Sequence, residues 1–273
     1  MILEMVVRGE AYNVAATDGA LNALAHVLLV TSYGNVANDA GEALWNIVND
    51  LSGDHGGDGA SEDGEDGEDG DRCGSDLVLQ AGLVAKLALC VEGARHPDGS
   101  TWAGSALATM AGKSNDALRD ELMACALPAL VRRLRSLPLD VDIACSVAMS
   151  AANTIEHLCK DTEDACSRLD DLVAAGAPDA LVAAFDACQE WEMISDVTDA
   201  LETMLSAERG GSRRGAQRRD AAAGRRRRLL SRDSIAKLKR WKAAPPPAPA
   251  EEGTSDDEIS IASAAARILD LLG

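Results

Sequence analysis

Aromatic residues are scarce in this 273-residue sequence: 3% of the residues are Phe, Trp or Tyr, whereas 47% are hydrophobic. β-Sheets favour aromatic and β-branched side chains, so a core built mainly of Ala and Leu argues against a β-sandwich or a β-barrel. Ala and Leu are strong helix formers, and a chain of this length can bury a sizeable core. The composition therefore predicts a mostly α-helical protein.

Long apolar runs and paired cysteine motifs are also missing. Nowhere do 18 apolar residues follow one another, and charges enter the N-terminal stretch too early for a secretory signal. The seven cysteines form no C-x-x-C, and six of them lie in apolar helical patterns. We therefore expect buried thiols rather than a disulfide framework, in a cytoplasmic or nuclear protein.

Catalytic and cofactor motifs are missing as well. The four histidines lie in different segments, without an H-E-x-x-H or a zinc-ligand spacing: His26, His55, His96 and His157. Neither the phosphate-binding G-x-x-x-x-G-K-[ST] nor the nucleophile elbow G-x-S-x-G occurs. We therefore predict no enzyme activity, no metal and no cofactor.

The sequence does contain an internal repeat. Four segments share a leucine five residues after an anchor position; the anchors are Gly19, Gly82, Cys125 and Gly176, and the leucines are Leu24, Leu87, Leu130 and Leu181. A second block begins about twenty-five residues after each anchor, at Leu44, Leu107, Ala152 (after a two-residue shift) and Leu201. Each unit is predicted to be a short helix, a Gly/Ala corner, a second helix, a loop and a longer third helix. Such units stack, because one alone cannot bury its leucine stripe.

These blocks resemble the armadillo repeat family, above all in Gly176-Ala177-Pro178-Asp179-Ala180-Leu181 and in Ala43-Leu44-Trp45-Asn46-Ile47. The resemblance covers about residues 10–205. It implies an all-α fold, a right-handed α-solenoid of about four repeats. The chain opens on the first repeat without an evident polar capping repeat, so we expect a truncated chain or a short natural cap.

The domain organisation that we expect follows from the repeats and the segments between them. It comprises a first repeat in 1–52, an acidic disordered insert in 53–76, repeats two to four in 77–208, a basic and then proline-rich linker or degenerate repeat in 209–250, and a C-terminal helix in 251–273. The insert has too few apolar residues to offset the entropy of ordering it. Its Asp and Gly residues meet no calcium-loop spacing, so we favour a solvated acidic segment over a calcium site.

Charge is distributed unevenly along the chain. The net charge is +12 for residues 209–242 and -5 for residues 251–273. Since the whole chain has a net charge of -19, the remaining residues have a net charge of -26. Three arginine clusters dominate the basic segment: Arg213 and Arg214; Arg218 and Arg219; and Arg225, Arg226, Arg227 and Arg228. They indicate a localisation signal, a nucleic-acid contact or a solvated linker. A further hypothesis is an intramolecular contact of 209–242 with an acidic groove, released by a partner or by phosphorylation near Ser231 or Ser234.

The family resemblance also implies a groove along the third helices that binds an extended partner. The position that is often asparagine in the family holds Asn46, Thr109, Thr154 and Thr203, and four residues earlier lie Glu42, Ser105, Ser150 and Asp199. The importin-alpha-like tryptophan at that earlier position is absent. Further acids on the third helices and two candidate anchors complete the predicted surface: Asp39, Asp196 and Glu202, with Trp102 and Trp191.

We therefore predict a scaffold or adaptor that binds a basic, extended segment of another protein. A nuclear-transport adaptor and a nucleic-acid-associated protein that uses the arginine clusters are the alternatives. We expect no association with membranes.

Overall fold

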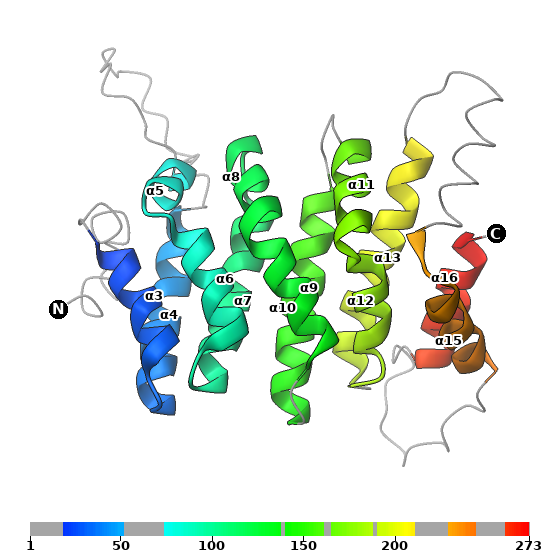
Figure 1. The fold of residues 1–273 in the computed structure, drawn as a ribbon, viewed down its shortest axis with the longest axis horizontal. Coiled ribbons are helices and arrows are strands. Elements are labelled where there is room, and N and C mark those ends of the chain that lie inside the picture. The colour runs from blue at the N-terminus through cyan, green and yellow to red at the C-terminus, as the bar shows by residue number, and fades with distance from the viewer. Residues whose placement is uncertain are drawn as a thin grey trace, which may run out of the picture. The chain divides into compact units, whose positions relative to one another are not determined.

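The computed structural model describes residues 19–51, 74–137, 140–160, 165–187, 190–210, 229–243 and 260–272. Every regular element in these ranges is a helix (Figure 1). The prediction of an all-α solenoid is confirmed, and its right-handed sense stays a prediction. The chain divides into two compact units, Met1–Ala126 and Leu127–Gly273, and the division falls inside the third repeat.

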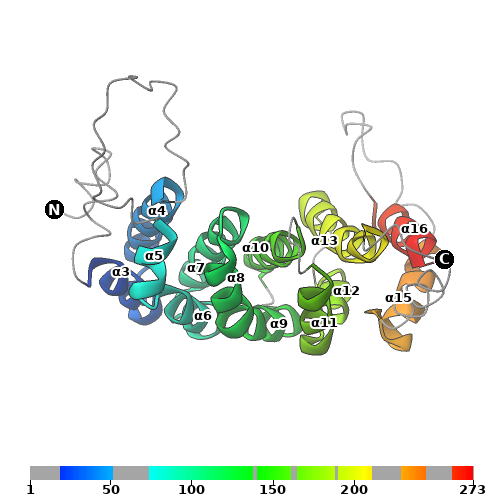
Figure 2. The same cartoon turned by 90° about the horizontal axis from the view of Figure 1, so that it is seen from above.

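In unit 1 the second and third helices of two repeats form two rows (Figure 2). α3 (Ala20–Val30) packs against α6 (Leu83–Gly93), and α4 (Gly34–Leu51) packs against α7 (Pro97–Gly112). The short α5 (Gly74–Gln80) and α8 (Asp116–Glu121), the latter followed by the π-helix η1 (Leu122–Ala126), are first helices. The core between the rows consists of the repeat leucines and their neighbours, among them Leu24, Leu28, Leu44, Leu87 and Leu107. Burying one such side chain contributes about 1.5–3 kcal/mol.

Unit 2 has the same two rows (Figure 2). One row holds α9 (Leu127–Arg135), α12 (Ala177–Ala184) and α15 (Arg232–Lys242); the other holds α10 (Val141–Cys159), α13 (Trp191–Gly210) and α16 (Ile261–Leu272). α11 (Ala165–Ala175) is a first helix. Thus α15 packs on α12 as α12 packs on α9, and α16 packs on α13 as α13 packs on α10. For residues 209–250, both the linker and the degenerate repeat stay predictions.

The predicted glycine corners are present at three of the four anchors. Gly19, Gly82 and Gly176 have φ angles of 78°, 60° and 79°, and each immediately precedes a second helix. This left-handed conformation is accessible to glycine without the steric cost that a Cβ imposes. The fourth anchor, Cys125, is different: it lies in η1, which leads directly into α9. Here the expected corner is replaced by a π-helical turn.

Two expectations about local structure need correction. α5 begins at Gly74, so residues 74–76 belong to a helix and not to the acidic insert, whose remaining residues lie outside the described ranges. Cys145 is disulfide-bonded, contrary to the expectation of thiols throughout. Cys90, Cys125 and Cys159 are free.

Candidate functional site

In unit 1 the third helices α4 and α7 are joined by side-chain hydrogen bonds. Trp102 Nε1 donates to Asn38 Oδ1 at 2.9 Å, and Trp45 Nε1 donates to Thr109 Oγ1 at 3.1 Å. Further along, Lys113 Nζ donates to the side-chain and main-chain oxygens of Asn49 at 3.1 and 3.3 Å. These three contacts hold the two helices in a fixed register.

The predicted anchor Trp102 is half-buried and lies directly on α4. A Cβ built at Gly41 would lie 2.6 Å from the Trp102 Cβ and closer still to two ring atoms, so only glycine leaves room for this side chain. Thr109 uses its hydroxyl twice, because it also donates to the Ser105 carbonyl at 3.0 Å. Asn46 is half-buried, and Asp39 and Glu42 are exposed on α4. Asp39 and Glu42 are therefore the most exposed of the predicted groove residues in unit 1.

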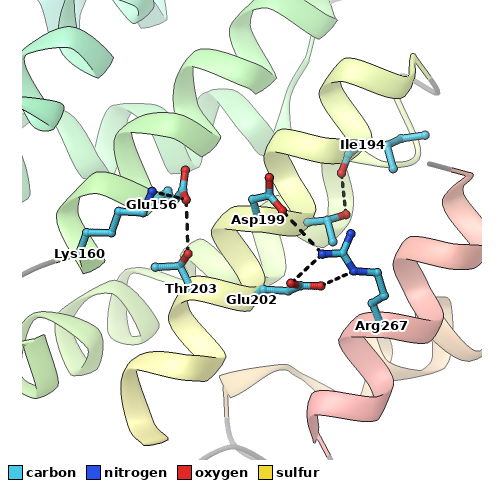
Figure 3. A network of polar contacts seen from close by, with 8 residues as sticks. Glu156, Lys160, Ile194, Asp199, Glu202, Thr203 and Arg267 are labelled. Atoms are coloured by element: carbon cyan, nitrogen blue, oxygen red, sulfur yellow. Dashed lines mark hydrogen bonds and ion pairs between the residues drawn. The ribbon is translucent and has the colours of Figure 1, made fainter. Parts of the chain in front are cut away.

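In unit 2 an open pocket of about 380 Å³ lies between α10 and α13. α10 contributes Glu156 and Cys159 to its lining, and α13 contributes Asp199, Glu202, Thr203 and Ser206. We call these six residues the acidic pocket. Each of its carboxylates lies close to a polar group: Thr203 Oγ1 donates to Glu156 Oε1 at 3.4 Å, and Lys160 Nζ lies 2.7 Å from the same oxygen (Figure 3).

A guanidinium from α16 completes this network (Figure 3). Arg267 Nε lies 2.8 Å from Glu202 Oε1, and one of its terminal nitrogens donates to Glu202 Oε2 at 2.9 Å. The same terminal nitrogen lies 3.9 Å from Asp199 Oδ1. Two parallel N–H···O contacts are the geometry that guanidinium and carboxylate groups favour. The chain's own Arg267 thus lies against the carboxylates of Glu202 and Asp199 at the edge of the acidic pocket.

Burial and mutual repulsion affect the acids near this pocket. Burial raises the pKa of Asp199, and the nearby Glu156 raises it further, although Arg267 opposes the shift. Burial also raises the pKa of Asp196, which accepts a hydrogen bond of 3.1 Å from Asn153 Nδ2. A bound cation would stabilise the anionic form of both carboxylates and so oppose these shifts.

The thiol in the acidic pocket is not activated. Burial, and to a lesser degree Glu156, raises the pKa of Cys159 to about 12. A nucleophilic cysteine needs the opposite shift, because the thiolate is the reactive form. Among the described residues no group of three or more His, Cys, Asp or Glu side chains could hold a metal ion. The pocket therefore offers charge and hydrogen bonds to a ligand, without an activated nucleophile.

Apart from the residues of α4 and α7 described above, the structure separates the predicted site residues into three sets. Asp196, Asp199 and Thr203 are brought together at or beside the acidic pocket. By contrast, Ser150 and Thr154 are buried, and Thr154 Oγ1 donates to the Ser150 carbonyl at 2.8 Å. These two side chains do not contribute to a surface. The clusters Arg213 to Arg228 and the Trp191 side chain lie outside the described residues.

Sequence reasoning missed Glu156, Lys160, Ser206 and Arg267. A signal for Arg267 did exist, because Ala264, Ala265 and Ile268 repeat the third-helix block and are buried as its other copies are. In that alignment Arg267 occupies the position of Asn46, Thr109 and Thr203. Glu156 had no comparable signal, since it lies four residues after the block position on α10.

Within the described parts of the chain, no helix has the length and apolarity that a membrane span requires. No protein-family model matches the sequence, and no curated protein matches it.

Two solved structures are similar to the whole chain. One is a designed armadillo repeat protein, with a TM-score of 0.55 and 17% identity over 100% of both chains. The other is an engineered protein from the Northeast Structural Genomics Consortium, with a TM-score of 0.58 and 17% identity. That match covers 99% of this chain and 88% of the other. The fold is an armadillo-like helical repeat fold.

Proposed function

On this armadillo-like scaffold, we propose that the chain is a protein-interaction module that binds a basic, extended segment of a partner protein. The third-helix face of unit 2 is the binding surface, and an arginine or lysine side chain of the partner enters the acidic pocket. The observation that carries this proposal is the arrangement of Glu156, Asp199 and Glu202 around one open pocket.

The electrostatics of the pocket support a cationic ligand. Lys160 and Arg267 compensate part of the charge of the three pocket carboxylates, and Asp196 adds a further acid beside them. The resulting negative surface would attract a basic segment and speed its encounter with unit 2. Thr203 and Ser206 add hydroxyl groups that can bind the polar atoms of a peptide.

Shape also favours a peptide over a buried small molecule. The pocket is open to solvent and lies between two adjacent helices, so a ligand is not enclosed. Repeat proteins commonly bind extended segments along such stacked helices. Binding therefore relies on several weak contacts along the helices in addition to one charged contact.

Fluorescence anisotropy with a labelled, arginine-rich peptide tests the proposal. The variant is Glu156→Gln/Glu202→Gln, and the matched control is Asp170→Asn/Asp171→Asn, which removes the same charge from exposed positions of α11. Loss of charge-assisted contacts predicts an affinity about tenfold lower for the pocket variant, and little change for the control. Equal losses in both variants would mean that only the overall charge attracts the peptide. No loss in either would refute the pocket as the binding site.

A further inference from the structure

The N-terminus of α15 is fastened to α12 by a single carboxylate. Asp179 Oδ1 accepts a hydrogen bond from the Ser231 backbone N–H at 2.9 Å and another from Ser234 Oγ at 2.6 Å. Ser231 is the N-cap of α15: its Oγ accepts from the Ser234 backbone N–H at 3.2 Å. Ser231 is exposed, whereas Ser234 is buried.

Further contacts hold the rest of α15 in place. Lys237 pairs with Asp186, and the Trp241 ring meets Phe185 edge to face with 5.5 Å between ring centres. These contacts lie beyond the first turn of α15. The first turn can therefore open locally while the remainder of the helix stays docked.

The sequence before Ser231 has a pattern that the proposed partner binding does not use. Four arginines, Arg225 to Arg228, lie six to three positions before Ser231, and Arg232 follows it directly. Protein kinases select their substrates partly by charge pattern, and acidic substrate grooves favour arginines shortly before the acceptor hydroxyl. Ser231 combines this pattern with an exposed position at a helix end, where its Oγ accepts from the Ser234 backbone N–H and donates to Ser234 Oγ, each at 3.2 Å.

We propose that Ser231 is a phosphorylation site for an arginine-directed serine/threonine kinase. In the reaction, Ser231 Oγ takes the γ-phosphoryl group of ATP, the hydroxyl proton is released, and ADP leaves. Leu229 and Leu230 are buried next to Ser231, so the kinase acts on the form in which the first turn of α15 has opened.

Phosphorylation then weakens the attachment of α15 to α12. A phosphoserine carries roughly -1.5 to -2 charges at neutral pH, and here they lie beside the Asp179 carboxylate. The N-terminus of α15 attracts the phosphate with roughly half a positive charge, which is less than the full negative charge of Asp179. The modified chain therefore favours the open first turn. This effect does not depend on which partner unit 2 binds.

The first test locates the phosphate. The full chain is incubated with Mg-ATP and an arginine-directed kinase, and phosphopeptides are mapped by mass spectrometry. We expect the phosphate on Ser231 in the unmodified sequence and in Ser234→Ala, and its loss in Ser231→Ala. A synthetic peptide of residues 223–236 is the positive control for the motif. Modification of the peptide without modification of Ser231 in the full chain would overturn the proposal, as would a phosphate found only at other residues.

The second test measures the consequence by hydrogen exchange of the α15 amides. Repulsion between a phosphate and a carboxylate about 5 Å apart in water predicts exchange about tenfold faster in the first turn after phosphorylation. In Asp179→Asn, which keeps an acceptor oxygen but removes the charge, the acceleration should be much smaller. Unchanged exchange in the phosphorylated chain, or equal acceleration with and without the Asp179 charge, would overturn the proposed effect.

Discussion

Replacing Gly41 by alanine should push Trp102 away from α4 and destabilise unit 1. The added Cβ would lie 2.6 Å from the Trp102 Cβ, a separation that real Cβ atoms essentially never show. The crowded atoms belong to the base of the indole side chain, so rotation of its far end cannot relieve them. Either α7 must shift or Trp102 must leave its rotamer, and both disturb its hydrogen bond to Asn38.

Two opposing terms set the size of the effect. An alanine in the middle of a helix is favoured over glycine by about 0.8–1 kcal/mol. Overpacking in a tight site costs about 1–3 kcal/mol, and the absence of an easy escape here argues for the upper part of that range. We therefore expect Gly41→Ala to lower the free energy of unfolding by about 1–2 kcal/mol.

Urea unfolding followed by tryptophan fluorescence and by circular dichroism measures this change. Gly93→Ala is the matched control, because Gly93 is also helical and a Cβ there would meet nothing within 4 Å. The control should be as stable as the unmodified chain or slightly more stable. If Gly41→Ala were also as stable as the unmodified chain, the close packing of Trp102 on α4 would be refuted.

Three further predictions concern unit 2 and the free cysteines. Arg267→Ala should strengthen the binding of a basic peptide, measured by anisotropy, because it leaves the acidic pocket more negative; stability should change by less than about 1 kcal/mol, since the Arg267 pair is partly exposed. Peptide affinity should fall as the solution is acidified, and the fall should begin at a higher pH than an ordinary Asp would give, because the pKa values of Asp196 and Asp199 are raised; Asp196→Asn/Asp199→Asn should flatten this profile. Burial raises the pKa of Cys90 and of Cys159 to about 12, so iodoacetamide at pH 8 should leave both unmodified in the folded chain, as peptide mapping would show. Rapid alkylation of either would contradict its buried environment.

The repeat architecture was predictable because it depends on local and periodic signals. A glycine before an apolar stripe marks a corner, and the three corners at Gly19, Gly82 and Gly176 have the left-handed backbone that the prediction required. The leucines at shared offsets are buried, as a stacked repeat demands. Cys125 departs from the pattern because, without glycine, the chain passes through a π-helical turn instead.

The binding surface was less predictable because facing side chains belong to different repeats. Thr109 and Thr154 occupy equivalent sequence positions, yet Thr109 is half-buried and Thr154 is fully buried. On α10 it is Glu156, two residues after Thr154, that lines the acidic pocket. Position within a repeat therefore did not predict which side chain reaches the surface.

The C-terminal helices were also only partly predictable from the sequence. In α16, Ala264, Ala265 and Ile268 follow the third-helix pattern of the earlier copies. The charge of residues 209–242 led to the hypothesis that this segment contacts an acidic groove of the same chain. Its described part, Arg232–Lys242, forms α15, which packs on α12 and α16. In the described part of the chain, Arg267 of α16 is a cation that contacts the pocket acids Asp199 and Glu202 from another helix. Composition indicated a basic segment, but tertiary contacts determine which of its residues are available.

Zero-length cross-linking tests the central claim most directly. A lysine-containing basic peptide is bound to the full chain, joined to nearby carboxylates with a carbodiimide, and the linked residue is identified by mass spectrometry. We predict links to Glu156, Asp199 or Glu202, which an unlabelled arginine-rich peptide should compete away. Links that map instead to exposed acids such as Asp170 and Asp171 of α11, with none at the acidic pocket, would contradict the proposed binding surface.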